Sequence, residues 1–133
     1  MNEGKTLNGL AKWHQLVATH DLAGIPSLLA DEVVFHSPLV HTPQEGKKLT
    51  TKYLQAAFLV LGTSNFRYLR EVVGERDAVL EFVAEVDGIT VNGVDLIRFD
   101  EAGLITDFKV MVRPLQAIQL VHKKMGELLQ KAG

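Results

Sequence analysis

Apolar residues follow a helical spacing through most of the first half of the chain. They recur every three or four positions over residues 7–20, 22–30 and 48–61, which is typical of one face of a helix. Asp21 is a suitable N-cap for the second of these helices. The β-branched and aromatic residues 33–37 predict a strand, which Pro38 ends. Residues 38–46 contain two prolines and a glycine, so we predict a loop there.

In the second half, apolar and polar residues alternate, which is typical of strands with one buried face. Alternating runs at residues 66–73, 78–86, 89–99 and 104–112 are separated by short turns, so we predict an antiparallel meander. Pro114 opens a last stretch with helical spacing. The order of elements predicts an α+β fold with helices on one face of a strongly bent, mainly antiparallel sheet. A sheet bent around a long helix forms a cone whose open end is a natural apolar pocket.

Length and charge narrow the range of functions. The 133 residues are enough for one domain, which we expect to span residues 1–133. The 14 Lys and Arg residues are balanced by 16 Asp and Glu and do not cluster, which argues against nucleic acid or a membrane surface as partner. The absence of cysteine excludes disulfide bonds and thiolate metal sites, and we expect no cofactor. The N-terminal residues lack the apolar run of a signal peptide, so we expect a cytoplasmic protein.

Three segments of the chain carry a family resemblance. They are residues 21–35, Gly46 with the helix that follows it, and residues 94–105, where a strand ending in Arg98-Phe99 turns through an acidic, glycine-containing loop. Together they resemble the nuclear transport factor 2-like superfamily, and within it the SnoaL-like polyketide cyclase and ketosteroid isomerase branch. The resemblance implies a cystatin-like, cone-shaped α+β barrel over nearly the whole chain. It does not fix the function, because this fold hosts isomerases, cyclases, hydrolases and non-catalytic binders.

Ketosteroid isomerases allow a residue-by-residue comparison. Their mechanism uses an Asp base together with a Tyr and a protonated Asp that both donate to the developing enolate oxygen. By resemblance, Asp95 takes the position of the protonated Asp, Trp13 that of the Tyr and Ser37 that of the base. An indole N–H still donates a hydrogen bond, but a serine hydroxyl is not an unassisted base near neutral pH. We therefore do not expect steroid isomerisation by that mechanism.

Asp95 is the first candidate catalytic residue. Strand alternation places it on the same face as Ile97 and Phe99, between large apolar neighbours. Two alternatives follow: an acid that faces the pocket, or a partly exposed acid paired with Arg98 or Lys109. The resemblance and the general link between perturbed acids and functional sites favour the first.

Histidines supply the remaining catalytic candidates. His36 and His41 flank Pro38 and are candidate replacement bases, because histidine titrates near neutral pH. No third ligand has a matching spacing, so we expect no metal site. The other histidines are expected on helix surfaces or flanks: His14, His20 and His122.

The predicted pocket wall is apolar. Alternation and the resemblance together assign to it Trp13, Ser37, Phe58, Phe82, Ala84, Val91, Ile97, Phe108, Val110 and Val112. Such a wall suits a flat hydrophobic ligand, but the same residues would also form a filled core.

Two functions from different classes remain open. The first is a small-molecule enzyme that performs proton transfer on a hydrophobic carbonyl compound, with Asp95 as hydrogen-bonding acid and His36 or His41 as base. The alternative is a non-catalytic module that holds an apolar ligand in the pocket or a protein partner on the sheet. The resemblance implies a homodimer formed through the sheet, and Val79 and Val83 beside Glu81 fit such a face.

Overall fold

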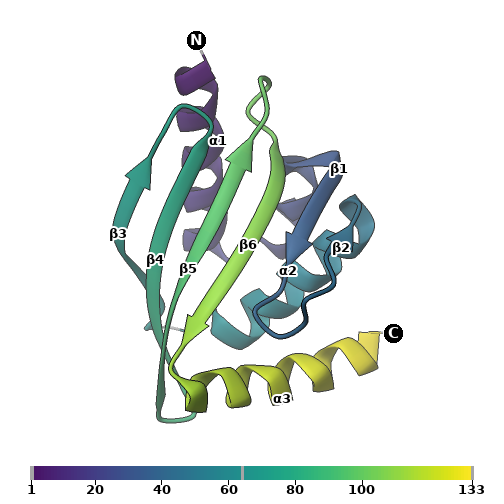
Figure 1. The fold of residues 1–133 in the computed structure, drawn as a ribbon, viewed down its shortest axis with the longest axis vertical. Coiled ribbons are helices and arrows are strands. Elements are labelled where there is room, and N and C mark those ends of the chain that lie inside the picture. The colour runs from purple at the N-terminus through teal and green to yellow at the C-terminus, as the bar shows by residue number, and fades with distance from the viewer. Residues whose placement is uncertain (1, 64, 133) are drawn as a thin grey trace.

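The computed structural model describes residues 2–63 and 65–132, without the side chains of residues 2, 3, 131 and 132 (Figure 1). Over these residues the elements are α1 (Asn2–Thr19), the 3-10 helix η1 (Leu22–Leu28), β1 (Leu29–His36), β2 (Gln44–Glu45), α2 (Lys47–Leu61), β3 (Arg67–Val73), β4 (Asp77–Val86), β5 (Ile89–Phe99), β6 (Ile105–Arg113) and α3 (Leu115–Ala132). The predicted α+β class is confirmed.

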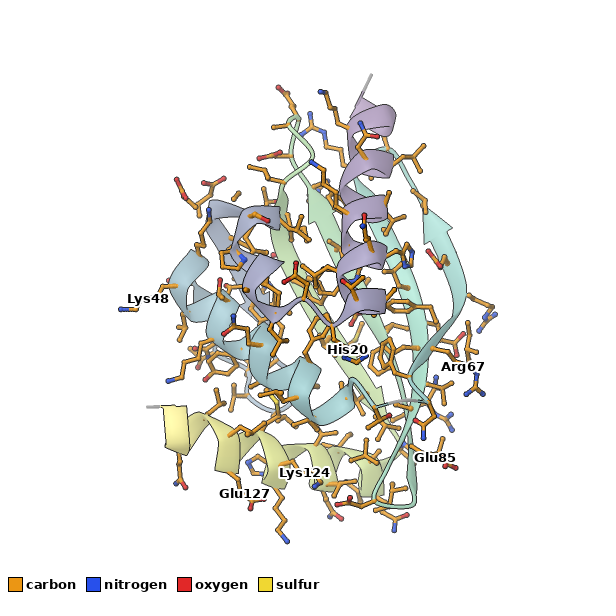
Figure 2. All side chains as sticks on the ribbon, turned by 180° about the vertical axis from the view of Figure 1, so that it is seen from behind. His20, Lys48, Arg67, Glu85, Lys124 and Glu127 are labelled. Atoms are coloured by element: carbon orange, nitrogen blue, oxygen red, sulfur yellow. The ribbon has the colours of Figure 1, made fainter. Side chains whose placement is uncertain are left out.

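The strands of the described chain form one curved sheet in the order β2-β1-β6-β5-β4-β3. Neighbouring strands are antiparallel except β1 and β6, which run parallel. Helices α1 and α2 cover the concave face, and α3 crosses one end of the sheet, where it packs against α2, β5 and β6 (Figures 1 and 2). The helices therefore enclose the space inside the bend.

Alternation along β4 and β5 separates an inner face from an outer face. The inner residues of β5 from Val91 to Phe99 are buried, whereas the residues between them are half-buried or exposed. Gly93 belongs to the inner series, and a Cβ atom there would lie 2.5 Å from Phe82 Cζ and 2.6 Å from the Met111 carbonyl oxygen. The missing side chain at Gly93 is thus what leaves room for the Phe82 ring beside this position.

Two local predictions differ from the structure. The second predicted helix is a shorter 3-10 helix, since Pro26 inside it cannot donate a hydrogen bond. Asp21 does cap it, accepting from the Gly24 N–H at 3.1 Å. Strand β2, which was expected to be loop, consists of two polar residues that pair with Val34 and Phe35 and carry no alternating pattern. None of the described helices is long and apolar enough to cross a membrane.

Candidate functional site

A cavity of about 290 Å³ lies between the concave face of the sheet and the three α-helices. This volume is close to the lower limit for small-molecule sites. Of the predicted wall residues, the following line it: Trp13, Ser37, Phe58, Phe82, Phe108, Val110 and Val112. Helix α3 closes one side with Val121 and Met125, both buried. The lining is mostly apolar and aromatic.

Asp95 is the buried acid of this cavity. It lies on the inner face of β5, and only 6% of its surface is exposed. The Tyr68 hydroxyl donates a hydrogen bond to Asp95 Oδ2 at 2.7 Å, and Trp13 Nε1 donates to the Tyr68 oxygen at 3.0 Å. Asp95 Oδ1 has no hydrogen-bond partner among the described residues, and this atom is accessible from the cavity. One carboxyl oxygen is thus fixed by the protein and the other is free.

Burial sets the protonation of this pair of side chains. It raises the pKa of Asp95 to about 7, and the hydrogen bond from Tyr68 offsets only part of that effect. Burial also raises the pKa of Tyr68 well above its usual value, and the nearby Asp95 charge raises it further. Tyr68 is therefore a neutral donor, while Asp95 is close to half protonated at neutral pH.

The direction of the two hydrogen bonds determines where the carboxyl proton lies. An indole nitrogen is only a donor, so Trp13 forces the Tyr68 oxygen to accept. Tyr68 then has one proton, which it donates to Asp95 Oδ2. When Asp95 is protonated, its proton is on Oδ1, the oxygen without a protein partner. The site then presents a carboxylic O–H donor to the cavity.

Aromatic rings hold Trp13 in place. Its ring lies 5.0 Å from that of Phe108 and 5.6 Å from that of Phe58, and the side chain is 2% exposed. Phe66 packs edge-on against the Tyr68 ring, with 5.2 Å between the ring centroids, and stacks on Phe82. Trp13 therefore belongs to the core and to the hydrogen-bond chain at once.

Sequence reasoning missed Tyr68. A bulge in β3 between Tyr68 and Glu71 breaks the alternation, so that both side chains face α1. There Trp13 bonds Tyr68, and His14 Nε2 pairs with Glu71 Oε1 at 2.8 Å. The available signal was the alternation of Phe66 and Tyr68, which puts both on one face before the bulge.

Neither predicted base lies at the cavity. His36 points to the outer face because its neighbours in the chain, Phe35 and Ser37, point inward. Its Nε2 pairs with Asp107 Oδ2 at 2.9 Å. His41 is exposed in the loop between β1 and β2. His20 is exposed at the end of α1, as expected for a helix flank, and it also lines the cavity.

Three predicted wall residues belong to the core and not to the cavity lining. Ala84, Val91 and Ile97 are buried on the inner face, as alternation requires, but they do not line the cavity. The cavity reaches β5 at Asp95, and the core is filled on either side of it. Among the described residues, no three metal-binding side chains come together.

Comparisons with known proteins place this architecture in a family. The chain matches the model of the SnoaL-like domain over residues 10–108. A steroid delta-isomerase from Pseudomonas aeruginosa is 39% identical, with a TM-score of 0.93, over 98% of this chain and 95% of that one. An uncharacterised protein with a cystatin-like fold from Silicibacter pomeroyi is 33% identical, with a TM-score of 0.82, over 90% and 83% of the two chains. No match was found among the curated proteins.

A more distant neighbour shares the fold and was solved with a ligand. It is a Mycobacterium tuberculosis protein in complex with estradiol-17β-hemisuccinate, 20% identical, with a TM-score of 0.65, over 85% of this chain and 96% of that one. The family model and the 39% identical structure both span most of the present chain. The protein therefore belongs to the SnoaL-like domain family, in the ketosteroid isomerase-like branch of the nuclear transport factor 2-like superfamily.

Proposed function

We propose that this protein binds an apolar, steroid-like small molecule in the cavity and holds one oxygen atom of that molecule against Asp95. The observation that carries the proposal is the free Oδ1 of a buried carboxyl group in an apolar cavity. Asp95 Oδ1 faces the cavity without a protein partner, so a ligand oxygen can form a hydrogen bond with it, and a hydrogen bond in apolar surroundings is stronger than one in water. The aromatic lining supplies the remaining contact area.

The comparisons support the choice of ligand class. The Pseudomonas aeruginosa protein is described as a steroid delta-isomerase, and the Mycobacterium tuberculosis protein was solved with a steroid ester. Steroids are rigid and largely apolar, and they carry a few oxygen atoms at their ends. Those properties match an apolar cavity that contains one buried acid.

The pKa of Asp95 provides a sharp test. A ketone oxygen only accepts hydrogen bonds, so it requires the protonated acid. With a pKa of about 7, the protonated fraction of Asp95 falls about tenfold between about pH 6 and pH 8, and the affinity for a ketone falls with it. An alcohol accepts from the acid and donates to the carboxylate, so its affinity changes much less.

The experiment measures binding of progesterone, a diketone, and of estradiol, which has only hydroxyl groups, across this pH range by calorimetry. In Asp95→Asn the amide N–H₂ donates at every pH, and progesterone affinity is expected to become independent of pH. Pairing progesterone with estradiol controls for pH effects on the rest of the protein. Progesterone binding that does not vary with pH in the wild type would contradict the role of Asp95. A failure of both steroids to bind would contradict the ligand class.

Proton transfer on a bound ketone is a second candidate function. It is favoured by the raised pKa of Asp95, since a neutral acid that donates to a carbonyl oxygen stabilises a developing enolate. Ser37 lines the cavity but is not a base, which weighs against isomerisation by the three-group mechanism. Incubation with a β,γ-unsaturated ketosteroid, followed by ultraviolet absorbance of the conjugated product, tests this candidate. Turnover lost in Asp95→Asn would support it, and binding without turnover would leave a non-catalytic binder.

We further propose that the outer face of the sheet pairs two copies of the chain. Val79, Val83, Val94 and Leu96 are only half-buried there, and Met111 is 50% exposed. Apolar side chains in a group on a surface are typical of an interface. Analytical ultracentrifugation of the wild type and of Val83→Glu tests it: a dimer is expected for the first and a monomer for the second.

A further inference from the structure

The cavity reaches the surface at the C-terminal end of α1. Most lining residues are buried or half-buried, but Ala18 and His20 both line the cavity and are exposed. Figure 2 shows His20 at the end of α1, beside α2. A Cβ atom on Gly62, which follows α2, would lie 3.4 Å from His20 Cε1. The mouth of the cavity is therefore bordered by the ends of two helices, with the imidazole of His20 at its edge.

The backbone at His20 is left-handed, with φ of 53°. Glycine usually occupies the residue that ends a helix in this conformation, because a side chain is strained there. The conformation lets the Asp21 N–H donate to the Leu16 carbonyl oxygen at 3.1 Å while the His20 side chain turns to the mouth. The chain thus bears local strain at a residue whose side chain borders the cavity, a combination typical of binding sites.

His20 also differs from the other histidines near the sheet. The rings of His14 and His36 are each bonded to a carboxylate. The His20 ring has no hydrogen bond to any described residue. Its N–H group is available in the neutral and the protonated form alike.

We propose that His20 binds a second oxygen atom of the ligand at the mouth of the cavity. This inference rests on the proposed function and narrows it. The ligand is an elongated apolar molecule with an oxygen at each end, one bound by Asp95 in the buried part of the cavity and one by His20 at the edge. A ligand with a single oxygen then binds more weakly than one with two.

Three steroids test the proposal at constant pH: estradiol, the analogue without its 17β-hydroxyl group, and the analogue without its phenolic hydroxyl group. Affinities are measured for the wild type and for His20→Phe, which keeps an aromatic ring but cannot form hydrogen bonds. His41→Phe is the matched control, because His41 is exposed and outside the cavity. Thermal unfolding of each variant verifies that it is folded.

In the wild type, removal of either hydroxyl group is expected to weaken binding roughly three- to tenfold. In His20→Phe, removal of the hydroxyl group that His20 binds is expected to change affinity less than twofold. Removal of the hydroxyl group that Asp95 binds is expected to weaken binding as much as in the wild type. His41→Phe should behave as the wild type. The proposal is overturned if His20→Phe retains both penalties, and the proposed function then still stands. If none of the three steroids binds the wild type, the proposed function fails and this inference fails with it.

Discussion

Asp95 and Glu81 are acids on neighbouring strands of one sheet, and they lie in opposite environments. Glu81 on β4 pairs in register with Val94, the residue next to Asp95 on β5. Glu81 is on the outer face, where Arg70 Nε donates to it at 3.0 Å and Asn92 Nδ2 at 3.2 Å. Asp95 is on the inner face, where its one hydrogen bond comes from Tyr68. The hydrogen bonds from Arg70 and Asn92 hold the pKa of Glu81 below its usual value, whereas burial raises the pKa of Asp95 to about 7.

The two faces of the sheet differ in how the charge of a carboxylate is compensated. On the outer face a guanidinium group compensates the charge. On the inner face no described cation pairs with Asp95, and a buried acid of this kind is unfavourable for folding unless it is protonated. The charge of Asp95 lowers the free energy of unfolding, and one of its oxygens is free to bond a molecule in the cavity. Such an acid is better explained by a role in binding than by a role in folding.

The largest expected effect is on the pH dependence of stability. Because the pKa of Asp95 is higher in the folded state than its usual value of 3.8, the folded state binds the proton more tightly. Its contribution to the free energy of unfolding is full below about pH 4 and is lost as the pH rises to about 7. The loss amounts to up to about 4 kcal/mol. Denaturant unfolding of wild type and Asp95→Asn from pH 4 to pH 8 is expected to show the wild type losing stability relative to the variant.

Glu81→Gln is the matched control, since it also replaces an acid by its amide. Its difference from wild type should be flat from about pH 6 to pH 8, because Glu81 titrates below about pH 4.5 in the folded state and near that pH in the unfolded state. If the stability of Asp95→Asn and that of the wild type keep a constant difference from pH 4 to pH 8, the carboxyl group is not the buried acid described above.

Tyr68→Phe is expected to have the next largest effect. It removes the donor to Asp95 and leaves the Trp13 N–H without its acceptor, so a loss of about 1 to 3 kcal/mol of stability is expected at pH 5, where Asp95 is protonated. The pKa of Asp95 should also rise above 7, since the lost hydrogen bond lowers it in the wild type. NMR titration of the carboxyl carbon measures this.

Tyr53→Phe is the control for that variant. Tyr53 is half-buried and packs on Phe35, but its hydroxyl has no hydrogen-bond partner among the described residues. Its loss should change stability by less than about 0.5 kcal/mol. Equal effects of the two substitutions would mean that the hydrogen bonds of Tyr68 do not contribute to stability.

Asp95 and Tyr68 also mark how far the sequence predicts the site. Asp95 lies on β5, a long strand with a neighbour on each side, and alternation places it on the inner face. The register of such a strand is strongly specified, because a one-residue shift would turn all of its buried side chains to the outer face. Strand β3 is at the edge of the sheet and is mostly exposed, so its register is less constrained, and the bulge that turns Glu71 to the same face as Tyr68 leaves no clear signal in the sequence.

The sequence does not show which histidine borders the cavity, for two reasons. His36 ends β1 and Ser37 follows it, so alternation excludes that both side chains face the cavity. Ser37 lines the cavity, and His36 does not. His20 follows the last residue of α1, and its direction depends on the left-handed conformation there, which local sequence does not specify for a histidine. Cavity volume likewise depends on how α3 closes the cone, a matter of tertiary packing.

Glu71 is a third acid of the sheet, and it pairs with a histidine. Its side chain is 34% exposed, and its partner His14 lies edge-on to the Tyr68 ring at 5.3 Å. Glu71→Gln should lower stability by about 0.5 kcal/mol, in the range of partly exposed ion pairs. A double-mutant cycle with His14→Gln measures the pair itself. A coupling energy of zero would show that the His14–Glu71 pair does not stabilise the packing of α1 on β3.

In a monomeric chain, which Val83→Glu is expected to give, the smallest effect is that of Glu81→Gln at neutral pH. The amide keeps an oxygen that accepts from Arg70, and the outer face is hydrated, so water and salt ions replace most of what the charge contributes. The expected loss of stability is smaller than that of Glu71→Gln, and it should shrink further when salt is added. As the pH falls below about 4.5, the wild type loses the contribution of the charged Glu81 and the difference between the two proteins disappears. In the wild type, where we propose that a second copy of the chain covers this face of the sheet, the loss is expected to be larger and insensitive to salt, because Glu81 is then shielded from water.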